Sequence, residues 1–225
     1  MVITIAVVIL VAIGVLLLIY NYSGTAAASS TSSNIVSNAV DGKTQLDSNV
    51  GIPLSYNQTE GLTFSYSAWI RVEDFAYRYG EEKVIFIKGP TDISAMCPGV
   101  FLDANTNSIL VKLDTYGARE IIPISNIPAK KWFHLVIAVD QDSIDVYING
   151  IVHTHKSFSQ LPLQNPSGVH VGVGGGFDGK IGALNYYNYF LKPADVTAIM
   201  GSPPNVQSEV DNSTNYQDIS FWTRS

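Results

Sequence analysis

The residues best suited to metal chemistry form an alternating run of oxygen-bearing side chains. Asp103, Asn105 and Asn107 occupy every second position, as the first ligands of a calcium loop do. Asp114 stands at the twelfth position of that pattern, where such loops carry an acidic ligand. Ser108, however, replaces the glycine that the loop needs for its sharp turn. We therefore expect a hairpin turn here, with a calcium site as the alternative.

The histidines offer two further arrangements. His153 and His155 lie two residues apart, so on a strand they would share one face as a pair of metal ligands. No third ligand can be named from the sequence, and we expect an ordinary exposed strand face. His134 lies within an apolar run without a serine or cysteine partner, so we expect an interior residue rather than a catalytic base.

The sequence does not support two kinds of enzyme site, a glycoside hydrolase site and a dinucleotide-binding site. Glycoside hydrolysis needs two carboxylates facing one cleft about 5–10 Å apart, but the only neighbouring pair among the six glutamates is Glu81 and Glu82, which would face opposite ways on a strand. The glycines of Gly174–Gly179 match a dinucleotide fingerprint, yet no helix follows them. We expect a loop there, at a bend where the sheets approach closely. The sequence predicts no catalytic residue and no cofactor apart from the calcium alternative.

The composition limits which partners and cysteine-based sites the protein can have. The 225 residues carry a formal net charge of −6, and the basic residues are scattered. A nucleic-acid surface would need clustered lysine and arginine, so we expect no nucleic-acid partner. Cys97 is the single cysteine, which excludes an intramolecular disulfide framework and a zinc cluster of cysteines.

The N-terminus predicts a membrane anchor over residues 1–22. Val2–Tyr20 is a run of nineteen residues without a charge, which as a helix spans about 30 Å, the thickness of a bilayer core. Tyr20 and Tyr22 stand where an interfacial aromatic belt is expected. A signal peptide cleaved near Ala26–Ala28 is the alternative, but no basic residue precedes the apolar run. We expect an uncleaved single-pass anchor with the bilayer as partner, and the side of the membrane stays open.

Polar segments flank the expected domain. Residues 23–50 are small and polar and predict a linker, although Ile35 and Val36 are suited to an edge strand. Residues 202–225 predict a polar tail that ends in an apolar group including Phe221 and Trp222. We expect these two aromatic residues to dock on a protein, either a neighbouring subunit or the domain itself.

Residues 51–201 predict an all-β domain of about ten short strands. In residues 63–72 alternation places Phe64 and Tyr66 on one face and Trp69 on the other. Trp132–Asp140 is apolar at nearly every position, which predicts a central strand covered on both faces. Asn149-Gly150 predicts a two-residue hairpin turn inside a three-strand meander. A single short helix is expected after Lys192, with Pro193 in its first turn.

The stretch Lys131–Gly150, "KWFHLVIAVDQDSIDVYING", resembles the signature of LamG-like, concanavalin A-like jelly-roll domains: Trp-x-His, a turn, then Tyr-x-Asn-Gly. The resemblance extends over Leu62 to Met200 through "FSYSAWIRV", "VIFIKG" and "VHVGVGGGFDGKIGALNYYNYF". It implies an antiparallel two-sheet jelly-roll sandwich. Relatives sometimes bind calcium through Asp and Asn residues at the rim. The fold serves lectins, adhesion modules, glycosidases and structural proteins, so it does not decide the function.

The closing strand departs from the family. Many relatives carry an acidic pair and an arginine there, whereas this chain has Gly182, Ala183, Asn185 and Tyr189. The tyrosines of "NYYNYF" predict an interaction surface, with burial of about half of them as the alternative; these candidates are Tyr186, Tyr187 and Tyr189.

The architecture predicts a membrane-anchored, non-enzymatic head with a structural or protein-interaction role. It is similar to membrane-associated proteins in the particles of large icosahedral DNA viruses, which implies a minor capsid protein linking an internal membrane to the protein shell. The alternative is a lectin-like adhesion domain that reads a glycan through its loops, and a glycoside hydrolase is the remaining option.

Overall fold

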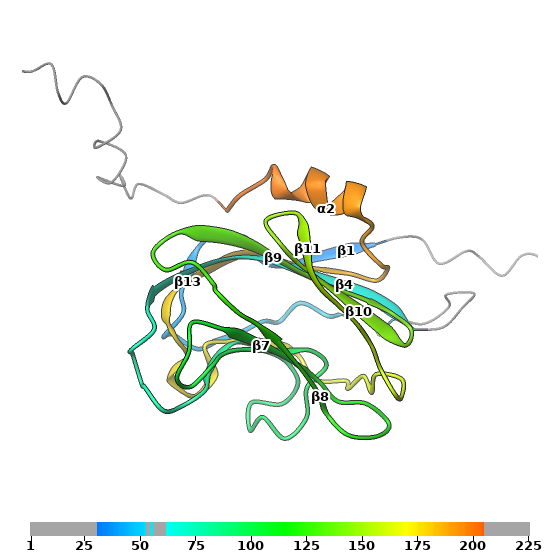
Figure 1. The fold of residues 1–225 in the computed structure, drawn as a ribbon, viewed down its shortest axis with the longest axis horizontal. Coiled ribbons are helices and arrows are strands. Elements are labelled where there is room, and N and C mark those ends of the chain that lie inside the picture. Colours follow the sequence, from blue (N-terminus) through cyan, green and yellow to red (C-terminus); the bar gives the residue numbers. More distant parts are fainter. Residues whose placement is uncertain (1–30, 53–54, 56–61, 205–225) are drawn as a thin grey trace, which may run out of the picture.

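The computed structural model describes residues 31–52, 55 and 62–204, which form two packed antiparallel sheets (Figure 1). Sheet A has seven strands in the order β1-β13-β4-β9-β10-β11, with β2 also paired to β13, and sheet B has six in the order β3-β12-β5-β6-β7-β8. The expected all-β antiparallel sandwich is confirmed. The elements are β1 Ser32–Val36, β2 Val40–Asp41, β3 Leu46–Asp47, β4 Thr63–Asp74, β5 Lys83–Lys88, β6 Gly99–Leu102, β7 Ile109–Leu113, β8 Glu120–Ile124, β9 Trp132–Asp140, β10 Ser143–Ile148, β11 Ile151–Ser157, β12 Val169–Val171, the 3-10 turn η1 Val173–Gly175, β13 Asp178–Tyr187 and α2 Pro193–Met200.

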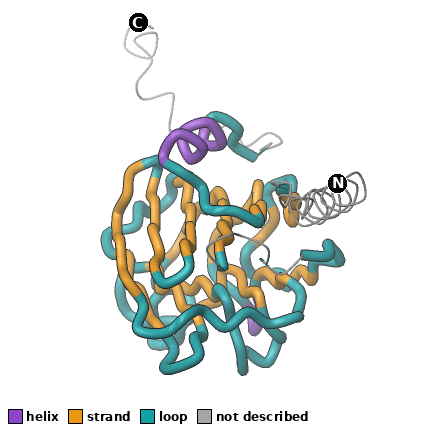
Figure 2. Tube along the Cα trace, turned by 90° about the vertical axis from the view of Figure 1, so that its right-hand side faces the viewer, coloured by secondary structure: helices purple, strands orange, loops and turns teal. Residues whose placement is uncertain are grey.

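Sheet A is buried on both faces at its centre. Phe64 and Tyr66 of β4 share one face, as predicted, and this face points into the main core between the sheets. Val136 and Ala138 of β9 point the other way and pack with Val196 of α2. The helix therefore covers the outer face of sheet A, as Figures 1 and 2 show from two directions. The prediction that β9 is covered on both faces is confirmed.

The three-strand meander β9-β10-β11 is also confirmed. Asn149 and Gly150 have φ angles of 50° and 80°, the positive values that a two-residue hairpin turn requires. The Asn149 amide also ties the turn to β9, because its Oδ1 accepts a hydrogen bond of 2.9 Å from the His134 backbone N–H. The turn between β10 and β11 is thus held against β9 at His134.

The predicted domain boundary at Gly51 is wrong. β1, β2 and β3 all lie in the segment expected to be a linker, and they pair with β13 or β12. Ile35 and Val36 are buried in the main core, so the alternative of an edge strand there is confirmed. The segment is rich in small and polar residues because its short strands lie at sheet edges, where half of the side chains face water.

The expected anchor, residues 1–22, and the tail aromatics Phe221 and Trp222 lie outside the described residues. Within the part that is described, no helix has the length and apolarity to cross a membrane. The tail begins on the domain surface, where Pro204 is buried and lies near Gly182 of β13.

Candidate ligand-binding site

A pocket with a volume of about 230 Å³ opens on the outer face of sheet A, beside the C-terminal end of α2. Strands β4, β9 and β13 form its floor, and the end of the helix with the residues after it forms one wall. Its lining residues are Ser67, Trp69, His134, Ala183, Asn185, Tyr187, Ile199 and Ser202.

Strand register brings these residues together from distant parts of the sequence. Trp69 of β4 lies opposite His134 of β9 on one side and opposite Gly182 of β13 on the other. Ser67 lies opposite Asn185 in the same way. Because side chains alternate along a strand, the residues that leave the core face of β4 must line the outer face beneath α2.

A bulge in β13 makes room for the pocket. The register with β4 shifts between Gly182 and Asn185, and Ala183 takes a φ of 46°. The Asn185 amide fixes this bulge, because its Nδ2 donates to the Ala183 carbonyl at 2.9 Å and its Oδ1 accepts from Asn34 Nδ2 at 2.7 Å. Ala183 lines the pocket with a small side chain, and a larger side chain at this position would project into the space.

Two of the lining residues carry a buried nitrogen atom without a hydrogen-bond partner among the described residues: Trp69 Nε1 and His134 Nδ1. The two rings lie side by side, with centroids 5.2 Å apart. Only 2% of His134 is exposed, and burial lowers its pKa to about 4, so the imidazole is neutral at pH 7. Leaving such a group unsatisfied costs about 1–3 kcal/mol, which marks this pair as the part of the pocket suited to bind a polar ligand.

The tyrosine cluster does not form the expected surface. Tyr186 is buried in the main core, with its ring centroid 5.1 Å from that of Tyr66, and burial raises its pKa. Tyr187 is also buried and packs edge-on to Tyr189 in the cluster beneath α2. The prediction that these tyrosines form an interaction surface is therefore wrong for Tyr186, while Tyr187 contributes to the pocket wall.

The calcium candidates form a hairpin turn between β6 and β7, as preferred on sequence grounds. The Asp103 carboxylate accepts hydrogen bonds from Asn105 N at 3.2 Å and from Thr106 N at 2.9 Å. The Thr106 hydroxyl also donates to it, and this bond lowers the pKa of Asp103. The described residues contain no group of three or more His, Cys, Asp or Glu side chains arranged to hold a metal ion.

The paired histidines lie on exposed strand β11, away from the pocket. His155 Nδ1 lies 2.6 Å from Asp145 Oδ1 on the neighbouring strand, and His153 contacts the Thr154 hydroxyl. Both are exposed, as expected for an ordinary strand face.

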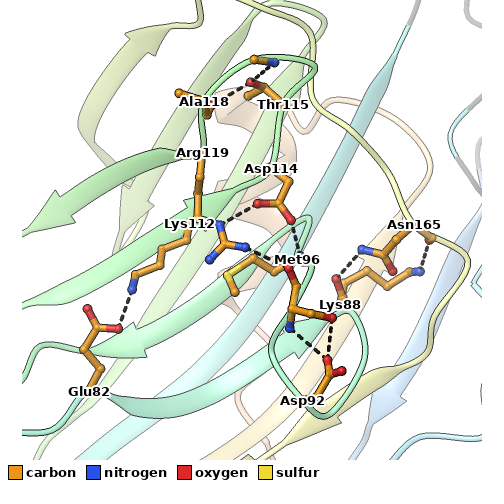
Figure 3. A network of polar contacts seen from close by, with 12 residues as sticks. Glu82, Lys88, Asp92, Met96, Lys112, Asp114, Thr115, Ala118, Arg119 and Asn165 are labelled. Atoms are coloured by element: carbon orange, nitrogen blue, oxygen red, sulfur yellow. Dashed lines mark hydrogen bonds and ion pairs between the residues drawn. The ribbon is translucent and has the colours of Figure 1, made fainter.

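Charged side chains gather instead around sheet B (Figure 3). The Asp114 carboxylate accepts a hydrogen bond of 2.7 Å from Met96 N and forms an ion pair of 2.6 Å with Arg119. Lys88 donates to the Asn165 carbonyl at 2.7 Å. Because the partners belong to the chain itself, these contacts fix the loops that flank sheet B, and we assign them a structural role.

The pocket residues were not among the sites predicted from the sequence. The usable signal was that Trp69 lies on the strand face opposite Phe64 and Tyr66, together with the departure from the family at Gly182, Ala183 and Asn185. Neither signal shows that Trp69 and His134 meet, because that depends on the register of β4 and β9.

A family model described as the concanavalin A-like lectin/glucanases superfamily matches residues 40–197. A search of curated proteins found no match.

Solved structures share the fold. The receptor binding domain of botulinum neurotoxin D is 14% identical with a TM-score of 0.59, over 79% of this chain and 48% of that chain. The binding domain of Paraclostridial Mosquitocidal Protein 1 is 19% identical with a TM-score of 0.55, over 78% and 48%. The binding domain of botulinum neurotoxin DC in complex with SialylT is 17% identical with a TM-score of 0.50, over 62% and 35%. The chain thus spans less than half of each of these three structures.

The family match covers more than half of the chain and includes β2 to the first turns of α2. It agrees with the two-sheet topology and confirms the resemblance seen in Lys131–Gly150. The chain belongs to the concanavalin A-like lectin/glucanase superfamily.

Proposed function

We propose that the chain is a non-enzymatic, carbohydrate-binding domain of the lectin type that uses the pocket on the outer face of sheet A. The observation that carries this proposal is the pair of buried nitrogen atoms, Trp69 Nε1 and His134 Nδ1, without a partner among the described residues. A sugar residue combines an apolar ring face with several hydroxyl groups. An indole beside a neutral imidazole matches both properties, since aromatic side chains supply apolar contact and a polar edge.

The comparisons support carbohydrate binding more than the structural role expected from the architecture. The matching family is described by its lectins and glucanases, and the similar structures are receptor binding or binding domains of toxins. One of them is a complex with SialylT. None of these matches has a virion or capsid protein in its description, so the link between a membrane and a viral shell has no support from them.

The absence of enzyme activity in this proposal follows from the pocket's side chains. None of its lining residues is Asp or Glu. Hydrolysis of a glycosidic bond needs a carboxylic acid and a second carboxylate on either side of that bond. The described pocket therefore has no carboxylic acid to protonate the leaving oxygen and no carboxylate to assist on the other side of the bond.

A glycan array tests the proposal. The full chain is purified in a polyoxyethylene detergent, which carries no sugar, and is applied with EDTA present. We expect saturable binding to a subset of glycans that free sugar displaces, and EDTA leaves it unchanged because the pocket has no carboxylate to hold calcium. Absence of binding across the array would refute the proposed function.

The apolar run Val2–Tyr20 places this domain at a membrane in our proposal. Deleting Val2–Tyr20 is expected to move the protein from the membrane pellet to the soluble fraction, because the remaining chain has no comparable apolar run. The measurement is immunoblotting after high-speed centrifugation, with carbonate-washed membranes of the full chain as control. Pelleting of the deletion variant with lipid would contradict the anchor.

A further inference from the structure

The pocket is uncharged. None of the lining residues that the structure describes is Asp, Glu, Lys or Arg. The lining includes one imidazole, that of His134, and burial lowers its pKa from 6.5 to about 4, so it carries no charge at pH 7. A carboxylate that entered this pocket would lose its water shell without gaining an ion pair, which is strongly unfavourable. An uncharged ligand pays no such penalty.

Among the described lining residues, two buried hydrogen-bonding atoms lack a partner, Trp69 Nε1 and His134 Nδ1. The Asn185 amide is already engaged with Ala183 and Asn34. Trp69 Nε1 can only donate, whereas the neutral His134 Nδ1 donates or accepts according to its tautomer. The two rings have centroids 5.2 Å apart, so one small ligand can contact both. Hydroxyl groups, which donate and accept, satisfy either tautomer.

Size limits the ligand further. The pocket volume of about 230 Å³ lies below the roughly 300–1,000 Å³ of sites for drug-sized molecules. A single sugar ring is therefore the expected occupant, with the rest of a glycan outside. The wall beside Trp69 is formed by Ala183, and a longer side chain at that position would project into the space.

We infer that the pocket takes one terminal, uncharged sugar residue, a neutral hexose or N-acetylhexosamine, and excludes sialic acid. The Trp69 indole N–H donates to one hydroxyl group of this residue, and His134 Nδ1 bonds a second. This inference rests on the proposed function and adds the class of sugar. It also distinguishes the chain from the neurotoxin structure described as a complex with SialylT.

A matched pair of glycans tests the selectivity. The full chain in polyoxyethylene detergent is titrated with immobilised glycans that end in galactose and with the same glycans capped by sialic acid, and the series is repeated for other neutral termini. We expect at least one neutral terminus to bind, and its sialylated counterpart to bind at least about tenfold more weakly. Equal or stronger binding of the sialylated glycans would overturn this inference and leave the proposed function standing. Absence of binding to every glycan would overturn both.

Two variants test the assignment to this pocket. Ala183→Leu fills the space beside Trp69 and is expected to abolish binding, while Val152→Leu on exposed β11 is the matched control that keeps it. Trp69→Phe keeps an aromatic face but removes the N–H donor, and it should weaken binding about 2–10-fold, the effect of one lost hydrogen bond. If Ala183→Leu fails to fold, the binding measured for Trp69→Phe alone tests the assignment to this pocket. Full affinity in Trp69→Phe would place the sugar elsewhere and overturn the inference.

Discussion

Replacing Gly176 with alanine is expected to lower the free energy of unfolding by about 3–5 kcal/mol. A Cβ at this position would overlap the backbone carbonyl oxygen of Gly42, which has no flexible side chain to yield. Gly176 also has φ 48° and ψ −142°, a conformation that residues with a Cβ rarely adopt. The loop therefore needs glycine both for its own backbone and for its contact with the N-terminal segment, because Phe177 N donates to the same Gly42 oxygen at 3.2 Å.

Gly174 provides the matched control for this prediction. It has a φ of 66° and a ψ of 28°, but a Cβ there would meet no atom within 4 Å. Gly174→Ala is therefore expected to cost only about 1 kcal/mol of backbone strain. Both variants can be measured by urea unfolding of the full chain in detergent, followed by near-ultraviolet circular dichroism. Equal losses in the two variants would contradict the close packing of Gly42 against the loop.

The second large effect is a loss of stability in mild acid that depends on His134. Burial lowers its pKa from 6.5 to about 4 in the folded protein, so the unfolded chain takes up a proton first as the pH falls. The stabilisation is complete above pH 6.5 and declines as the pH falls from 6.5 to about 4. At about 1.36 kcal/mol per pH unit, this window corresponds to a loss of about 3 kcal/mol.

His134→Gln should remove this component, because glutamine does not titrate. Unfolding free energies measured at half-unit steps between pH 4 and 7 are expected to fall less steeply in His134→Gln than in the wild type. His153→Gln retains the buried imidazole and should keep the wild-type loss. The carboxyls of Asp47, Asp92 and Asp103 have pKa values lowered below 3.8, so their own contributions are lost at lower pH than this window. Identical slopes in the wild type and His134→Gln would mean that His134 is not held neutral.

Local patterns predicted much of the fold. Alternation in β4 placed Phe64 and Tyr66 on one face, which is the core face in the structure, and the nearly unbroken apolar run of β9 predicted cover on both faces. Turn chemistry identified Asn149-Gly150, and Pro193 marked the first turn of α2. Each of these features depends on neighbours in the sequence, which is why periodicity and composition were sufficient.

The errors arose where the outcome depends on distant partners. β2 and β3 have two residues each, too few to show alternation, and they are ordered by their pairing with β13 and β12. The face that Tyr186 occupies depends on the bulge near Ala183, because a one-residue shift exchanges the two faces of a strand. The pocket also depends on distant partners, because three strands and the end of α2 contribute its walls.

The central claim is that a sugar contacts Trp69 in the pocket, and the indole N–H resonance of that residue measures it directly. The chain has three tryptophans, Trp69, Trp132 and Trp222, so a ¹⁵N–¹H spectrum of the full chain in detergent has three indole signals to assign. Trp69→Phe identifies the signal of interest. Titration with the neutral sugar that binds best on the array should shift the Trp69 signal in proportion to saturation and leave the Trp132 signal in place. Saturable binding with an unmoved Trp69 signal would contradict the account.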